Sequence, residues 1–85
     1  MKHVASPQFW RAYRRLPASV RKLARKNFKL LKSDMKHPSL HLKKVDPFWS
    51  VRIGQSHRAL AVERQEALVW FWVGSHSDYN RLINS

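Results

Sequence analysis

A histidine and a tyrosine follow directly after the most apolar segment of the chain. Residues 67–73 are all apolar, and this run ends at Gly74. A short polar segment with His76 at its centre comes next and leads to Tyr79. Imidazole exchanges protons near neutral pH, so a histidine held at the end of a rigid strand is suited to acid–base catalysis. Tyr79 can stack on a nucleobase or orient a phosphate; packing within a terminal helix is the alternative.

Basic and polar side chains on neighbouring predicted strands can form a phosphate-binding surface beside this histidine. If helices cover one face of the sheet, these side chains share the other face. Cleavage of RNA through its 2′-OH moves a proton from that hydroxyl and gives one to the 5′-oxygen, while fixed cations stabilise the charge that grows on the phosphate. This chemistry needs no metal ion or cofactor. A solvated strand face with a hydrogen-bonded histidine is the alternative. The side chains are Lys43, Ser50, Arg52, Arg58 and His76.

The other histidines are poor candidates for a metal site. His37 and His41 are four residues apart, but Pro38 lies between them and disfavours a shared helix face. The chain has no cysteine and few carboxylates that would complete a site with these two or with His57 and His76. We therefore expect no metal centre.

Two helices are predicted near the start of the chain. Ser6 and Pro7 form a helix-start signal, and apolar residues at helical spacing continue until Pro17. Residues 18–32 have an apolar stripe at spacings of three and four and a strongly basic opposite face. The brief connection predicts a helical hairpin whose apolar stripes cover a sheet. The alternative is that the basic helix lies on a membrane surface or in the groove of an acidic partner.

Strands make up most of the remaining chain. The hydrophobic period changes to two from Leu40 onward, and Gly54 marks a hairpin turn. We expect an α+β fold in which two N-terminal helices pack on one face of a small, mainly antiparallel sheet, in the order β-α-α-β-β-β with a short C-terminal helix, as a single domain over residues 1–85. The predicted strands are residues 2–5, 40–45, 48–53, 57–63 and 67–73, the last being central, and residues 78–83 are the C-terminal helix.

The charge of the chain is strongly positive. Seventeen Lys and Arg face five Asp and Glu, which gives a net charge of +12, and residues 1–33 contain no acidic side chain. Such a field favours a polyanionic partner, namely nucleic acid, an anionic membrane or an acidic protein. No apolar run is long enough to span a bilayer, so we expect a soluble, cytoplasmic protein.

Four segments, in their order and spacing, resemble the RelE/ParE superfamily of bacterial toxins. They are HPSLHLKK (37–44), WSVRIG (49–54), HRALAVE (57–63) and VWFWVGSHSDY (69–79). The Gly-Ser-His-Ser-Asp element is particularly similar to the Gly-Thr-His-Ser-Asp of the YafQ-like branch. The resemblance implies the toxin of a type II toxin–antitoxin pair, whose cognate antitoxin, encoded by an adjacent gene, wraps the toxin.

The RelE-like branch cuts mRNA in the ribosomal A site and leaves a 2′,3′-cyclic phosphate and a 5′-OH. The resemblance implies that His76 is a catalytic acid or base and that Arg52 and Arg58 clamp the phosphate. Tyr79 is expected to position the substrate at the same site. The basic helical face is expected to dock on ribosomal RNA, with no membrane partner. The expected substrate-binding side chains are Lys43, Lys44, Ser50 and His57.

The chain departs from the family pattern at three places. RelE carries a pair of lysines on the strand that here reads Ser50-x-Arg52, and His57 replaces the aromatic residue common before the arginine. Asn80 is nearer than Tyr79 to the place of the aromatic residue that ends the YafQ active site. These departures leave open the ParE branch, which lacks the ribonuclease residues and inhibits DNA gyrase by protein binding. A non-catalytic nucleic-acid-binding domain on the same scaffold is the other alternative.

Overall fold

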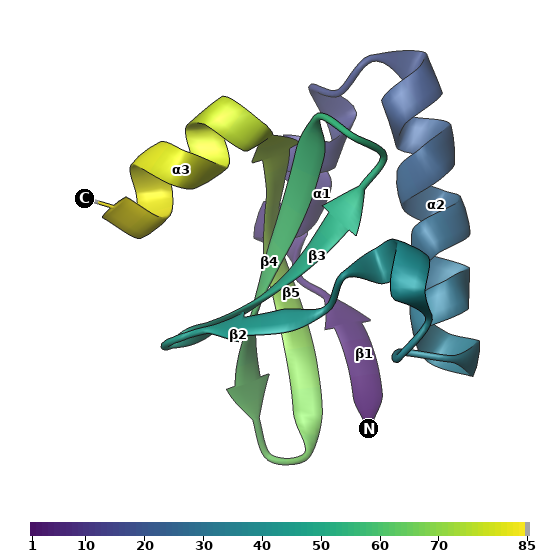
Figure 1. Cartoon of the computed structure of the whole chain (residues 1–85), viewed down its shortest axis with the longest axis vertical. Coiled ribbons are helices and arrows are strands. Elements are labelled where there is room, and N and C mark those ends of the chain that lie inside the picture. Colours follow the sequence, from purple (N-terminus) through teal and green to yellow (C-terminus); the bar gives the residue numbers. More distant parts are fainter. Residues whose placement is uncertain (85) are drawn as a thin grey trace.

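A five-stranded sheet forms the centre of the molecule in the computed structural model, which describes residues 1–84 (Figure 1). The predicted α+β class is confirmed, and all four strands whose ranges are predicted after the helical hairpin are present, one more than the order β-α-α-β-β-β counts. The elements are β1 (Lys2–Ala5), α1 (Pro7–Arg14), α2 (Ala18–Ser33), the 3-10 helix η1 (Pro38–Leu40), β2 (Lys43–Val45), β3 (Phe48–Ile53), β4 (His57–Arg64), β5 (Ala67–Ser75) and α3 (His76–Asn84).

The strands lie side by side in the order β1-β5-β4-β3-β2. β1 runs parallel to β5, and all other neighbours are antiparallel. β5 is an interior strand as predicted, but the middle strand of the sheet is β4. The pairing register between β4 and β5 shifts at Leu60 and Ala61, so that Phe71 of β5 has no directly opposed residue on β4. Phe71 consequently contacts Phe48, while Trp70 enters the core.

The aromatic residues divide between the core and the two sheet faces. Trp70 is fully buried, whereas Trp49, Phe71 and Trp72 are only half-buried. The Trp72 side chain lies over Gly74. A Cβ atom placed at this glycine would lie only 2.5 Å from the indole ring. The absence of a side chain at Gly74 therefore lets the aromatic ring lie flat against the end of β5.

The strand predicted from Leu40 begins three residues later. Leu40 is the last residue of η1 and is completely buried, and β2 starts at Lys43. The alternation of apolar residues suggested an extended chain, but Pro38 starts the short helix and His41 adopts a left-handed φ of 45°. This conformation turns the chain sharply before β2.

Both N-terminal helices start and pack as the sequence predicts. The Ser6 hydroxyl accepts a hydrogen bond from the Phe9 backbone N–H at 3.2 Å, with Pro7 in the first helical position. α1 and α2 contribute Phe9, Tyr13, Leu31 and Ala24 to the core. α1 packs on β5 and α2 on β3, so the hairpin covers one face of the sheet.

His3 is a buried titratable group within this core. Its Nδ1 accepts a hydrogen bond from the Trp70 indole at 3.1 Å, and the two rings stack with centroids 6.1 Å apart. Its Nε2 is buried, and no group in the described part of the chain forms a hydrogen bond with it. Burial, the N-terminal ammonium group and Lys32 all lower the pKa of His3 below its ordinary value of 6.5.

This lowered pKa predicts a loss of stability in mild acid. As pH falls below 6.5, the unfolded chain binds a proton at His3 before the folded chain does, so the free energy of unfolding falls until the folded-state pKa is passed. The slope from this group is at most about 1.4 kcal/mol per pH unit. His3→Gln keeps an acceptor for the Trp70 indole and removes the titration. Urea unfolding at pH values from neutral to about 5 is expected to show a smaller loss for this variant; equal losses would contradict the assignment.

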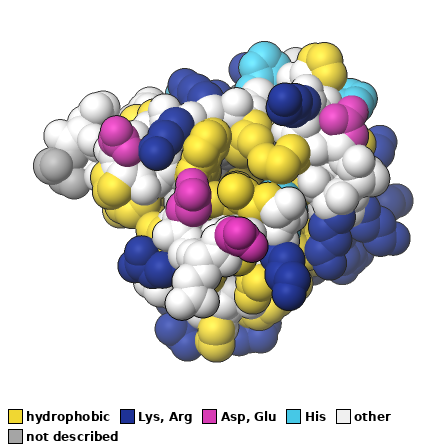
Figure 2. All heavy atoms as spheres, turned by 90° about the horizontal axis from the view of Figure 1, so that it is seen from below, with side chains coloured by type: hydrophobic (Ala, Val, Ile, Leu, Met, Phe, Trp, Pro, Cys, Tyr) yellow, Lys and Arg dark blue, Asp and Glu magenta, His cyan; other side chains and the backbone are white. Residues whose placement is uncertain are grey.

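Positive charge dominates the surface. Figure 2 shows the end at which β4 turns into β5, with acidic side chains near the middle of the view and Lys and Arg around its margin. Only two ion pairs form within residues 1–84, Lys44 with Asp46 and Arg81 with Asp78. Most bases therefore remain available to an anionic partner. No helix in the described part of the chain is long and apolar enough to cross a membrane.

Candidate functional site

Four of the predicted site residues share the sheet face that the helical hairpin leaves open. Lys43 pairs with Ser50 across β2 and β3, and Arg52 pairs with Arg58 across β3 and β4. Directly opposed residues in a sheet project to the same face. Trp49, Val51 and Ile53 alternate with them toward the hairpin, as the sequence predicts, and Val51 and Ile53 lie in the core.

Arg58 is a buried cation without an anionic partner. It is only 8% exposed, and its Nη1 donates a hydrogen bond to the Ser50 hydroxyl at 3.1 Å. Its guanidinium carbon lies 5.2 Å from the centre of the Tyr79 ring. No carboxylate within residues 1–84 forms an ion pair with it. Because burying an uncompensated charge is costly, this arrangement is typical of a site that receives an anion.

Tyr79 covers this arginine from α3. The tyrosine is 2% exposed, and its ring stacks with His76 at a centroid distance of 5.8 Å. Its hydroxyl is buried and has no hydrogen-bond partner among the described residues 1–84, which is uncommon for a polar group in a folded protein. Tyr79 thus packs as a residue of the terminal helix and links a buried cation to a histidine.

His76 is exposed at the first position of α3. Its backbone N–H donates to the Ser56 carbonyl at 2.8 Å, which ties the start of α3 to the turn between β3 and β4. The helix was predicted to begin at Asp78. It begins two residues earlier because the Ser75 hydroxyl accepts a hydrogen bond from the Asp78 backbone N–H, in the manner of an N-cap.

Arg52 has a partner that sequence reasoning did not assign to the site. Its Nη1 lies 3.2 Å from Nε2 of His41, and its backbone carbonyl accepts a hydrogen bond from Asn27 of α2. β2 pairs only as far as Ser50, so Arg52 lies where β3 has become the edge of the sheet. His41 reaches it through a left-handed turn that no local sequence signal indicates.

Two predicted substrate-binding residues lie away from this cluster. Lys44 pairs with Trp49, where its Nζ is 5.6 Å from the indole centroid and 3.8 Å from Asp46. His57 is paired with Ile53 and contacts the Ser56 hydroxyl at 3.0 Å. Both residues therefore project to the side of the hairpin. Within residues 1–84, no three His, Asp or Glu side chains gather in a way that would hold a metal ion.

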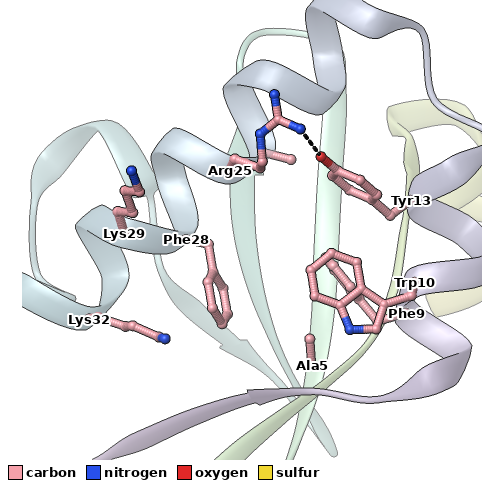
Figure 3. Close-up of a pocket in the computed structure, with 9 residues that line it drawn as sticks. Ala5, Phe9, Trp10, Tyr13, Arg25, Phe28, Lys29 and Lys32 are labelled. Carbon is pink, nitrogen blue, oxygen red and sulfur yellow. Dashed lines mark hydrogen bonds between the residues drawn. The ribbon is translucent and has the colours of Figure 1, made fainter.

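A second surface feature is an apolar groove between α1, α2 and β1, with a volume of about 280 Å³ (Figure 3). Trp10 is 40% exposed and contacts Phe9 and Tyr13 edge-on. Basic side chains of α2 form the rim, and Arg25 donates a hydrogen bond to the Tyr13 hydroxyl at 3.0 Å. The groove is lined by Ala5, Phe9, Trp10, Tyr13, Ala24, Arg25, Phe28, Lys29 and Lys32.

Comparison with known proteins identifies relatives of this fold. A model of the ParE-like toxin domain matches residues 18–81. No curated protein sequence gave a match. Among solved structures, a RelB–RelE antitoxin–toxin complex from Methanococcus jannaschii superposes with a TM-score of 0.73 at 12% identity, over 93% of this chain and 96% of that chain.

Two further structures are similar at comparable identity. A YoeB/ParE toxin from Agrobacterium tumefaciens has a TM-score of 0.68 at 19% identity, over 89% of this chain and 99% of that chain. A copper-bound point mutant of a toxin from Helicobacter pylori has a TM-score of 0.59 at 20% identity, over 92% and 97%. At these identities the structures establish the shared fold.

Proposed function

Because this chain belongs to the ParE-like toxin domain family, we propose that it is the toxin of a type II toxin–antitoxin pair and acts as a ribosome-dependent mRNA interferase. The observation that carries this proposal is the buried, uncompensated Arg58, which is paired with Arg52 and connected through Tyr79 to an exposed His76. Two fixed guanidinium groups beside a group that exchanges protons are suited to the binding and cleavage of a phosphodiester.

The proposed reaction is attack by the RNA 2′-OH on the adjacent phosphorus. The bond to the 5′-oxygen breaks, and the products are a 2′,3′-cyclic phosphate and a 5′-OH. One proton leaves the 2′-hydroxyl and one is given to the 5′-oxygen; His76 carries out one of these transfers and solvent water the other. Arg52 and Arg58 stabilise the charge on the phosphate oxygens, and Lys43 holds a neighbouring phosphate. No cofactor enters this scheme, which operates in the cytoplasm where ribosomes translate.

Access to Arg58 requires a small movement. Tyr79 covers the guanidinium group, so the phosphate first meets Arg52 and His76, which are more exposed. We propose that Tyr79 turns aside when RNA binds and that its unpaired hydroxyl then donates to a phosphate oxygen. The phosphate would thus give Arg58 an anionic partner and the Tyr79 hydroxyl a hydrogen-bond acceptor, neither of which residues 1–84 supply in the free protein.

His76→Ala provides the first test of this proposal. Loss of a general acid or base typically lowers the rate by about 10²–10⁴-fold, while the exposed position predicts little change in folding stability. Asn84→Ala is the matched control, because Asn84 is an exposed residue at the other end of the same helix. Primer extension on mRNA from programmed ribosomes measures the cuts. Undiminished cleavage by His76→Ala would contradict the assigned role.

The partner proposed for the apolar groove is the cognate antitoxin. The apolar floor around Trp10 and Phe28 suits an amphipathic segment, and the rim formed by Arg25, Lys29 and Lys32 suits acidic side chains on it. The net charge of +12 favours an acidic partner in general. The antitoxin is therefore expected to insert an apolar side chain between α1 and α2.

Inhibition of DNA gyrase is the second candidate function, favoured by the match to the ParE-like domain and by the single arginine where RelE carries two lysines. A gyrase inhibitor would act by protein binding and would need neither His76 nor the ribosome. A non-catalytic nucleic-acid-binding domain would depend on its positive charge and would also not need His76. Retained toxicity of His76→Ala, together with a block of supercoiling by purified gyrase, would favour gyrase inhibition over the interferase.

A further inference from the structure

A pocket of about 390 Å³ lies beside η1, at the edge of the sheet next to Arg52. Pro38 of η1 and Trp49 of β3 both line the pocket, and η1 contacts β3, the strand that carries the arginine. Its volume is within the range of about 300–1,000 Å³ that is typical of small-molecule sites. The side chains that give it its chemical character are Met35, Lys36, His37, His41, Leu42 and Trp49.

His41 connects this pocket to the proposed phosphate site. It lines the pocket, and its Nε2 is 3.2 Å from Nη1 of Arg52. Its positive φ of 45° is uncommon for a residue with a side chain and is maintained by the surrounding structure. Trp49 projects toward the hairpin and Arg52 to the open face, so His41 connects the pocket with the phosphate site around this edge of the sheet.

The lining suits the flat, neutral ring of a nucleobase. The Trp49 indole is fixed in position, because its N–H donates to Glu63 at 3.1 Å. Met35 and Leu42 supply apolar walls, and no carboxylate from residues 1–84 lines the pocket. Aromatic and imidazole rings with apolar walls are the surfaces on which proteins stack unpaired RNA bases.

Hydrogen bonds outside the pocket set which ring nitrogens of the two histidines carry protons. Arg52 can only donate, so Nε2 of His41 accepts and Nδ1 of the neutral ring is the donor. Nδ1 of His37 accepts from the Ser39 backbone N–H at 3.2 Å, so its Nε2 is the donor. Both rings thus offer N–H groups, which suit a base with adjacent acceptors such as N7 and O6 of guanine.

We infer that this pocket binds a nucleobase with adjacent acceptor atoms, from the nucleotide next to the phosphate held by Arg52. The inference rests on the proposed function, because the base belongs to the RNA that the toxin cleaves. It adds His41 to the substrate-binding residues and makes the pocket a determinant of which nucleotide lies beside the cut.

Titration with GMP tests the pocket without ribosomes or cleavage. The indole N–H resonance of Trp49, followed by NMR, is expected to shift with millimolar GMP and to remain in place with ribose 5-phosphate, which lacks the base. His41→Ala, an exposed substitution, is expected to weaken GMP binding about fivefold or more. Asn84→Ala is the control, because it removes an exposed side chain outside the pocket and is expected to leave GMP binding intact.

The outcomes separate the pocket from the proposed function. Three results would each contradict the proposal that this pocket binds a nucleobase, even if the wild-type protein cleaves mRNA. They are an unmoved Trp49 resonance, an equal shift with ribose 5-phosphate, and full GMP binding by His41→Ala. If GMP binds as expected and the wild type cleaves no mRNA, the pocket is supported and the interferase is contradicted. If both hold, His41→Ala is expected to cut at a changed set of nucleotides.

Discussion

Replacing Arg58 with methionine is expected to lower mRNA cleavage by about 10²–10³-fold, the usual effect of removing one donor that stabilises a developing oxyanion. Folding stability is expected to stay equal or to rise by about 0.5–2 kcal/mol. The reason is that Arg58 is a buried cation whose only side-chain hydrogen bond within residues 1–84 goes to the Ser50 hydroxyl, and methionine fills similar space without a charge. A gain in stability with a loss of activity is the signature of a group kept for function.

Arg64→Met is the matched control for this prediction. Arg64 lies at the exposed far end of the same strand, and its side chain contacts only a neighbouring backbone carbonyl. Single-turnover cleavage and urea unfolding should be measured for both variants. Cleavage by Arg58→Met at the wild-type rate would contradict the assignment of Arg58 to the catalytic site. A large loss of stability would instead mean that the cation supports the fold.

Replacing Trp10 with alanine is expected to weaken the complex with the cognate antitoxin by about 30-fold or more, since a tryptophan at the centre of an interface commonly contributes about 2 kcal/mol or more. Trp10 lines the groove between α1 and α2 and is 40% exposed, so folding should change little. Its removal deletes the largest apolar surface that the groove presents to a partner.

Leu23→Ala serves as the control for the groove. Leu23 is also 40% exposed and belongs to α2, but it lies outside the groove lining. Calorimetry with the purified antitoxin compares the two variants with the wild type. Equal affinities for Trp10→Ala and Leu23→Ala would place the antitoxin on another surface.

The spacing of apolar residues and the local turn and cap signals were sufficient to predict the start of α1, the core face of β3 and the hairpin turn after β3. The Ser6-Pro7 signal marks the start of α1, and the alternation around Val51 correctly separates the core face of β3 from the face of Ser50 and Arg52. Gly54 adopts a φ of 63°, as a hairpin glycine should. These features follow from backbone sterics and from the burial of one face of each element.

The same alternation also excludes some of the residues that were predicted to form the site. Neighbouring residues on a strand project to opposite faces, so Lys43 and Lys44 could not both join the site, and neither could His57 and Arg58. The contact of His41 with Arg52 could not be predicted, because it depends on a left-handed residue between η1 and β2. The burial of Tyr79 depends on how α3 packs against β4, which is a tertiary contact.

The most direct test of the interferase uses the substrate rather than the protein. Wild-type toxin is added to ribosomes programmed with either an all-RNA message or one in which the nucleotide before the scissile phosphate carries a 2′-deoxyribose. The mechanism predicts cutting of the first message, with a 2′,3′-cyclic phosphate at the new end, and no cutting of the second at that position. Cleavage of both messages would contradict attack by the 2′-OH, and cleavage of neither by a folded protein would contradict the interferase itself.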